Sequence, residues 1–274
     1  MDPSPRLARI RIYPLKSLDA MDLETAIIGS GGGLLHDREF GLFDALGNPL
    51  IGKTTAHVHG LHGRVDFAAK TVAFRRREEM DWHVYDFETQ IDRANAYLSE
   101  YFGFPVFLRR DTHSRFLDKP DWSGATLVST ATLQAVAAWY PGMDTLEIRD
   151  RFRATLEIEG VPPFWEDGLF GPEGSALAYR IGEVTLWGIG PRSRCVVPTR
   201  HPETAKVYPG FAPSFSKSRF ANLPVNSGLR PYSNHYYLTV DSYFPDSEIG
   251  KTLRVGDRLE RVGTLLPAPP QRGF

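Results

Sequence analysis

The chain has 274 residues, with 32 lysines and arginines against 33 aspartates and glutamates, and a formal net charge of −1. Its length suits one large domain or two modest ones, and its 42% hydrophobic and 24% charged residues are ordinary for a globular protein rather than a disordered or fibrous one. The balanced charge argues against nucleic acid or an anionic membrane as a partner, because both attract a strong overall positive field. An anionic ligand would need local arginines and lysines.

No apolar run approaches the ~20 residues that a membrane helix needs, and the first ten residues lack the layout of a signal peptide. We therefore expect a cytoplasmic protein. The single cysteine, Cys195, excludes an internal disulfide, a thiolate zinc cage and an iron–sulfur cluster, which all need several thiolates. A lone cysteine is ordinarily a small buried hydrophobic residue, and that interpretation stays open here.

The first part of the chain predicts short strands. Ile10 and Ile12 alternate with arginines, which is the pattern of a half-buried strand, and Pro14 ends it. Short strands with frequent turn signals between them indicate a barrel or a strongly bent sheet. Further strand-like runs follow at residues 40–43, 65–67 and 71–74.

Two helices are predicted from the spacing of apolar residues. In residues 92–101 the apolar positions recur at helical spacing, and Gly103 is a plausible stop. The second helix begins near Ser129 and Thr130, which suit an N-terminal cap, and it stops at Pro141.

The rest of the chain returns to strands, so we expect a β-rich α+β protein with more strand than helix. No period of 20–50 residues is present, which argues against a solenoid or propeller. A soft boundary between residues 109 and 121 divides the chain into expected domains at 1–115 and 116–274. Later strands are predicted at residues 155–159, 183–187, 236–240 and 258–262.

Several polar groups are candidates for a site. Lys16 and Ser17 follow a strand that proline terminates, on a loop free to approach a ligand, although a solvated strand end is the simpler interpretation. Three histidines, at positions 57, 59 and 62, form a cluster, but few aspartates or glutamates that could complete a metal site lie near them in the sequence. We regard them as ordinary surface histidines rather than a metal site.

The region around Cys195 differs from these isolated polar groups, because it places basic residues beside a thiol. Arg192 and Arg194 lie within three residues of the thiol, and positive charge favours the thiolate, which is both a nucleophile and a soft-metal ligand. Arg151 and Arg153 offer more positive charge at the start of another predicted strand. Together these residues would suit an anionic cofactor held against a reactive sulfur.

These motifs resemble a known family. Residues 12–17, Ile-Tyr-Pro-Leu-Lys-Ser, followed by Asp37 and Arg38, are similar to the N-terminal β-barrel segment that precedes MOSC domains, named after the C-terminus of molybdenum cofactor sulfurase. The resemblance covers nearly the whole chain, in the family's order. Segments similar to the MOSC domain itself are residues 151–153, 163–167, 181–184, 193–197, 201–204 and 255–257.

The resemblance implies a barrel-like N-terminal domain, a C-terminal β-barrel MOSC domain and a molybdenum-pterin cofactor. The family's metal-binding cysteine falls on Cys195. Its basic contacts to the cofactor fall on Lys16, Arg38 and Arg153. Ser129, at an expected helix N-terminus, would add amide donors to the same anion. The full set of expected cofactor-binding residues is Lys16, Ser17, Arg38, Ser129, Arg151, Arg153 and Arg194.

The resemblance also implies a function. Relatives such as the mitochondrial amidoxime-reducing component reduce small N-hydroxylated compounds at molybdenum. Because the chain lacks the cysteines of a ferredoxin-like cluster, a separate electron-donor protein is implied. Two alternatives stay open: a sulfur or cofactor carrier that uses Cys195 without turnover, and a cysteine hydrolase in which His201, the histidine nearest in sequence, is the base.

Overall fold

The computed structural model describes residues 4–118, 124–225, 227–267 and 269. These residues form a mixed α/β protein in which strands predominate, with fifteen strands and four α-helices. The predicted excess of strand over helix is confirmed. No described helix is long and apolar enough to cross a membrane.

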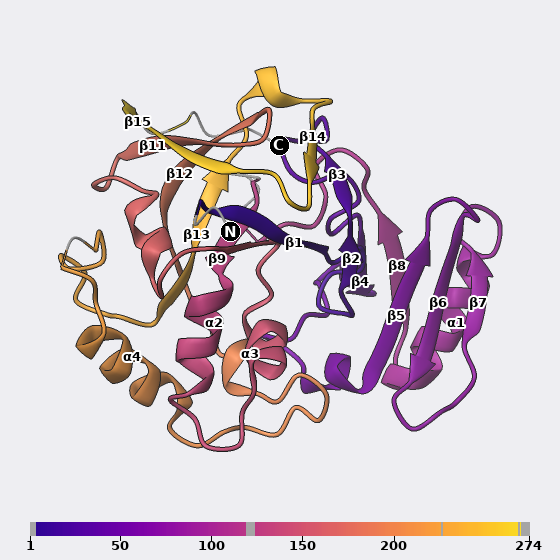
Figure 1. The fold of residues 1–274 in the computed structure, drawn as a ribbon. Helices are drawn as coiled ribbons and strands as arrows, with labels where there is room; N and C mark the ends of the chain where they lie inside the picture. Colours follow the sequence, from indigo (N-terminus) through magenta and orange to yellow (C-terminus); the bar gives the residue numbers. More distant parts are fainter. Residues whose placement is uncertain (1–3, 119–123, 226, 268, 270–274) are drawn as a thin grey trace.

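The centre of the molecule is a mixed eight-stranded sheet (Figure 1). Only β9 and β10 pair in parallel; the other neighbours are antiparallel. The edge strands β15 and β2 do not pair with each other in the described chain, so the predicted barrel is not confirmed. The order is β15 (Leu259–Pro267), β11 (Ser175–Ile181), β12 (Val184–Ser193), β13 (Tyr237–Tyr243), β9 (Thr126–Ser129), β10 (Leu156–Glu159), β1 (Arg6–Ile12) and β2 (Met21–Leu23).

The N-terminal strand therefore belongs to the large sheet. In β1, Ile10 pairs with Leu156 of β10, although most of the first 110 residues form a separate lobe. The alternation read from the sequence explains this placement, since Leu7, Ile10 and Ile12 all join the core of the large sheet.

Three small sheets complete the strands. In Figure 1 the lobe of β5, β6 and β7 lies to one side of the large sheet, with α1 (Ile91–Phe102) beside it. Residues 15–108 supply the lobe's own hydrophobic core. The sheets pair β3 (Thr25–Ile27) with β14 (Thr252–Arg254), β4 (Phe40–Asp44) with β8 (Val106–Arg110), and β5 (Leu61–Asp66), β6 (Thr71–Arg76) and β7 (His83–Asp86) in that order.

Both predicted helices are present. Gly103 ends α1 with a left-handed φ of 78°, and the Ser129 side chain accepts a hydrogen bond from the Thr132 amide at the start of α2 (Thr130–Ala137). Two further helices, α3 (Thr145–Phe152) and α4 (Phe211–Ala221), were not predicted. Short 3-10 helices occupy Ala56–Gly60 (η1), Trp165–Gly168 (η3), Val197–Thr199 (η4) and Asp246–Glu248 (η5).

Candidate functional site

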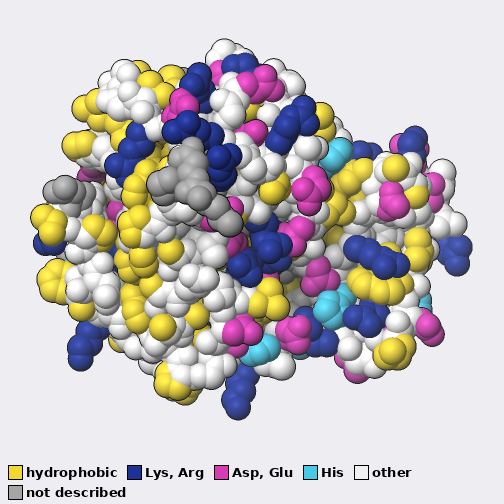
Figure 2. Space-filling view, viewed as in Figure 1, with side chains coloured by type: hydrophobic (Ala, Val, Ile, Leu, Met, Phe, Trp, Pro, Cys, Tyr) yellow, Lys and Arg dark blue, Asp and Glu magenta, His cyan; other side chains and the backbone are white. Residues whose placement is uncertain are grey.

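A pocket of about 500 Å³ is lined by residues from both the lobe and the large sheet. Figure 2 shows charged and histidine side chains gathered where the two meet. The pocket brings together residues that lie far apart in the sequence. Seven of the eight predicted site residues line it: Lys16, Ser17, Arg38, Arg151, Arg153, Arg194 and Cys195.

The lining is strongly basic. Ten arginine and lysine side chains face the pocket against four aspartates and glutamates. This local excess contrasts with the net charge of −1 for the whole chain. A site of this kind favours an anionic ligand, because clustered charges of one sign raise the local potential even when the protein is neutral overall.

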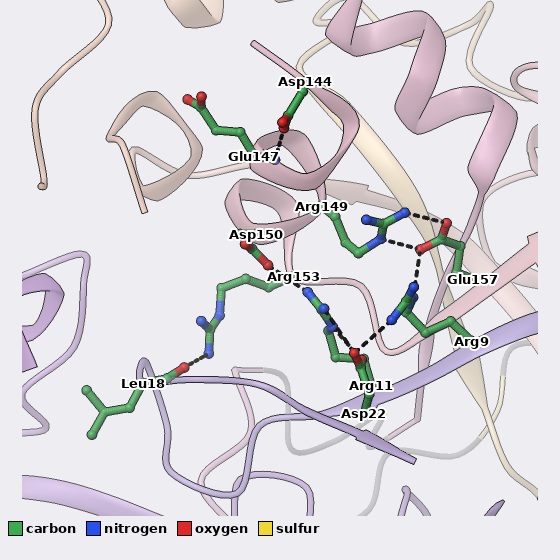
Figure 3. Close-up of polar contacts among 10 residues, drawn as sticks. All are labelled: Arg9, Arg11, Leu18, Asp22, Asp144, Glu147, Arg149, Asp150, Arg153 and Glu157. Carbon is green, nitrogen blue, oxygen red and sulfur yellow. Dashed lines mark hydrogen bonds and ion pairs between the residues drawn. The ribbon is translucent and has the colours of Figure 1, made fainter. Parts of the chain in front are cut away.

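Arg38 and Arg153 line the pocket, and both have left-handed backbone conformations that non-glycine residues seldom adopt. Their φ angles are 56° and 53°. Arg38 forms an ion pair with Asp37, and its amide donates to the Tyr13 carbonyl at 2.9 Å. Arg153 caps the C-terminus of α3, and its Nη2 donates to the Leu18 carbonyl at 2.7 Å (Figure 3). Such strained positions are maintained by surrounding contacts and concentrate at functional sites.

The last turn of α3 is fastened to the sheet by an ion-pair network. Arg11 lies between Asp22 and Asp150, with nitrogen–oxygen distances of 2.8 and 2.6 Å (Figure 3). Arg149 of α3 pairs with Glu157 of β10 at 2.6 Å. Because these contacts hold α3 from two sides, they also determine where Arg153 emerges from its end.

Burial and neighbouring positive charge lower the pKa of two pocket arginines. The pKa of Arg153 lies below its ordinary value because of burial and the nearby Arg38. Burial and the adjacent Arg192 lower the pKa of Arg194 to about 10. An anion in the pocket would offset both effects, since a negative charge favours the protonated guanidinium.

Cys195 lies half-exposed at the pocket, just beyond the end of β12. The residues before it anchor the segment: Arg192 pairs with Asp241 at 3.0 Å, and the Arg194 amide donates to the Tyr236 carbonyl at 2.9 Å. The thiol therefore sits on a well-supported segment within a basic pocket.

Lys16 and Ser17 lie on the loop after β1. The Lys16 amide donates to the Phe40 carbonyl at 2.8 Å, and its Nζ lies 3.1 Å from an oxygen of Asp118. Burial lowers the pKa of the Lys16 ammonium, although Asp118 opposes the shift. The Ser17 hydroxyl accepts a hydrogen bond from the Gly52 amide at 3.3 Å.

Two predicted site residues have mainly structural contacts. Ser129 is not among the pocket-lining residues, because its buried hydroxyl caps α2 and hydrogen-bonds to Thr132. Arg151 lines the pocket, but it pairs with Glu147 at 2.7 Å and donates to the Pro198 carbonyl at 2.7 Å. Its guanidinium is therefore largely committed to the protein.

The histidines of the lobe do not form a metal site. Across the described ranges, no group of three histidine, cysteine or acidic side chains is arranged to hold a metal ion. His59 and His62 line the pocket, but their Nδ1 atoms contact the Pro202 carbonyl at 3.0 Å and Asp19 at 2.9 Å.

His201 is poorly placed as a base for Cys195. It is not among the pocket-lining residues, and its Nδ1 accepts hydrogen bonds from the Glu203 and Thr204 amides. This arrangement argues against His201 as the base of a cysteine hydrolase, because that base must lie within reach of the thiol.

Several pocket residues were not singled out from the sequence. The ring of Tyr13 contacts the guanidinium groups of both Arg38 and Arg153. Because Tyr13 belongs to the first family-like motif, residues 12–17, the sequence could have indicated that it lies at the site. Arg200 donates to the Gly52 carbonyl at 2.6 Å, and this contact joins the lobe to the segment after Cys195. No local pattern marks Arg200, because its contact crosses between distant parts of the chain.

Comparison with known proteins adds no family assignment. No protein-family model matches the chain, and a search of curated proteins finds no significant match. The interpretation of the pocket therefore rests on the motifs and on the geometry described above.

Proposed function

We propose that this protein binds a molybdenum-pterin cofactor in the basic pocket and acts as an oxidoreductase of the MOSC type. The observation that carries the proposal is the meeting of Cys195 with Lys16, Arg38 and Arg153 in one pocket. These residues come from motifs at both ends of the resemblance. The family's barrel description stays part of the same proposal and rests on the resemblance alone.

The chemistry of the lining residues fits such a cofactor. A thiolate is a soft ligand suited to a sulfur-rich metal site, so Cys195 would bind molybdenum. Arg38 and Arg153 would hold the cofactor's phosphate, because the planar guanidinium matches the oxygens of a phosphate group. When bound, the cofactor would supply two-electron redox chemistry.

The substrate class that we propose is a small N-hydroxylated or N-oxide compound. Reduction of an N–OH group to N–H consumes two electrons and two protons and releases water. An iron–sulfur cluster needs several cysteines, and Cys195 is the only one in this chain. A separate electron-donor protein therefore supplies the electrons. The half-exposed thiol of Cys195 leaves the proposed metal position accessible to a small substrate.

A carrier function is the second candidate. The half-exposed thiol of Cys195 would bear a persulfide, or the pocket would pass on its cofactor without turnover. This candidate uses the same residues as the reductase, so only activity measurements separate the two.

The decisive test uses a Cys195→Ser variant produced in a host that makes the cofactor. Serine keeps the size of the side chain but replaces a soft thiolate with a hard, largely protonated hydroxyl. We expect an unchanged fold, altered metal coordination by X-ray absorption, and loss of benzamidoxime reduction with a chemical donor. Ser233→Ala, a change at an exposed position outside the pocket, is the control and should stay active.

Three outcomes are informative. A serine variant that keeps molybdenum coordination and full reduction would exclude Cys195 as the ligand. A wild-type protein that binds the cofactor but reduces no N-hydroxylated or N-oxide compound would favour the carrier. Absence of the cofactor from wild-type protein would reject the proposal.

A further inference from the structure

We propose that the ring of Tyr13 positions Arg38 and Arg153 as a paired clamp for a phosphate group. Resting on the proposed function, the inference adds a positioning residue that the family motifs do not assign. Tyr13 follows β1, is 1% exposed, and lines the pocket.

The geometry around the ring is that of two cation–π contacts. The guanidinium carbon of Arg153 lies 3.9 Å from the ring centre of Tyr13, and that of Arg38 lies 4.9 Å from it. Both distances are within the ~6 Å over which the negative face of an aromatic ring attracts a cation. One ring thus contacts the guanidinium groups of two arginines that lie about 115 residues apart in the sequence.

Each guanidinium is anchored by one of its terminal nitrogens. Nη1 of Arg38 pairs with Asp37, and Nη2 of Arg153 donates to the Leu18 carbonyl. Within the described chain, we find no hydrogen bond from the remaining nitrogens of either group to another residue. The anchors therefore orient both guanidinium groups and leave donors for a ligand.

Arg38 and Arg153 carry like charges beside one ring, but their surroundings differ. Asp37 and Asp118 oppose the effect of burial on Arg38 and hold its pKa above the ordinary value. Burial and the charge of Arg38 lower the pKa of Arg153. The aromatic ring offsets part of this cost, because its faces carry partial negative charge. A phosphate anion would offset more of it, because its oxygens accept hydrogen bonds from guanidinium groups.

Either the ring or the hydroxyl of Tyr13 could position the two arginines, and their contacts distinguish the two. Its Oη is buried and has no hydrogen-bond partner among the residues that the structure describes. Burial also raises the pKa of the Tyr13 hydroxyl, so the group stays neutral. The contacts to both arginines are made by the ring face, and we therefore assign the positioning role to the ring.

The test measures inorganic phosphate binding by calorimetry, on the full chain produced without cofactor. Tyr13→Phe keeps the ring, and fluorinated phenylalanines at position 13 weaken its negative face at nearly constant size. We expect Tyr13→Phe to bind within about twofold of the wild type and the pentafluoro variant to bind roughly threefold to tenfold more weakly. Thermal unfolding of each variant separates lost binding from lost folding.

Trp82 provides a matched control outside the pocket. Its ring contacts Arg64 at 4.2 Å and Arg75 at 5.1 Å, which is a similar pair of cation–π contacts. Trp82→Leu should therefore leave phosphate affinity unchanged. If it weakens binding as much as fluorination at position 13 does, phosphate binding is not specific to the Tyr13 pair and the proposal is wrong.

Other outcomes would also overturn the clamp. Equal affinity across the fluorinated series would exclude a cation–π role, and loss of binding in Tyr13→Phe would assign the role to the hydroxyl. Absence of saturable phosphate binding by the wild type would reject the clamp itself. Ring-dependent phosphate binding by a protein that never reduces an N-hydroxylated compound would reject only the proposed function.

Discussion

Arg194 donates a hydrogen bond from its Nη2 to the backbone carbonyl of Phe152, the last residue of α3. Its guanidinium carbon also lies 5.2 Å from the centre of the Phe152 ring. The residue before Cys195 is thereby joined to the residue before Arg153. The proposed metal ligand and the proposed phosphate ligand are linked through this one side chain.

Replacing Arg194 should disturb both halves of the pocket. We expect Arg194→Met to weaken phosphate binding roughly tenfold, because a charge-assisted hydrogen bond and a pocket charge are both lost. Amide exchange in the last turn of α3 should become faster in the same variant. Unchanged exchange and unchanged affinity would show that the contact does not organise the pocket.

Removing either clamp arginine should lower cofactor occupancy. Loss of a charge-assisted contact to phosphate costs about 1.5–3 kcal/mol, or one to two decades in affinity, so Arg38→Ala and Arg153→Ala should lose most of their bound molybdenum at limiting cofactor. Elemental analysis of protein purified from a cofactor-producing host gives the measurement. Arg180→Ala, which breaks an exposed ion pair with Glu260, is the control. Wild-type molybdenum content in both pocket variants would contradict the assignment.

His59 should make the protein less stable in mild acid. Burial lowers the pKa of His59 below its ordinary value of 6.5, opposed in part by the hydrogen bond to the Pro202 carbonyl. The unfolded chain therefore takes up this proton at a higher pH than the folded one. The contribution to stability is present above about pH 6.5 and is lost as the pH falls below it.

The measurement compares unfolding midpoints in urea between pH 7.5 and 5 for the wild type and His59→Gln. The variant should lose less stability over this range than the wild type does. His57→Gln, at an exposed position on the same 3-10 helix, should retain the wild-type slope. Identical pH slopes for wild type and His59→Gln would refute the prediction.

Gly188 of β12 should not tolerate a side chain. A Cβ atom there would lie 1.7 Å from the backbone oxygen of Leu169, which cannot move aside as a side chain does. We expect Gly188→Ala to reduce the free energy of unfolding by about 1–3 kcal/mol or to prevent folding, as overpacking does. In Gly29→Ala the nearest atom would be 3.5 Å away, so this control should be close to wild type in urea unfolding.

Local features were predictable from the sequence because their causes are local. The alternation in Ile10 and Ile12 predicted β1, and Gly103 marked the end of α1 through its freedom to adopt a positive φ. The Ser129 side chain caps α2 as expected. Helices α3 and α4 were missed, since their apolar residues pack on partners that are distant in the chain.

The site was predictable only as a set of motifs. The resemblance to a known family singled out Lys16, Arg38, Arg153 and Cys195, all of which line one pocket. The same reasoning also included Ser129, because a helix N-terminus offers amide donors wherever it lies. Whether such a terminus faces a pocket or a core depends on packing, and here the Ser129 hydroxyl is buried against Thr132.

Only the tertiary structure decided how these motifs act together. The pairing of β1 with β10 brings Tyr13 to the end of α3, where its ring meets Arg153. Arg200 also meets Gly52, 148 residues away in the sequence, and Arg194 meets Phe152, 42 residues away. These contacts depend on strand pairing and burial of the whole sheet, which are cooperative and have no local pattern. The sequence therefore showed which charged residues and motifs are present. The fold decided which of these side chains meet in the pocket and which contacts they make with one another.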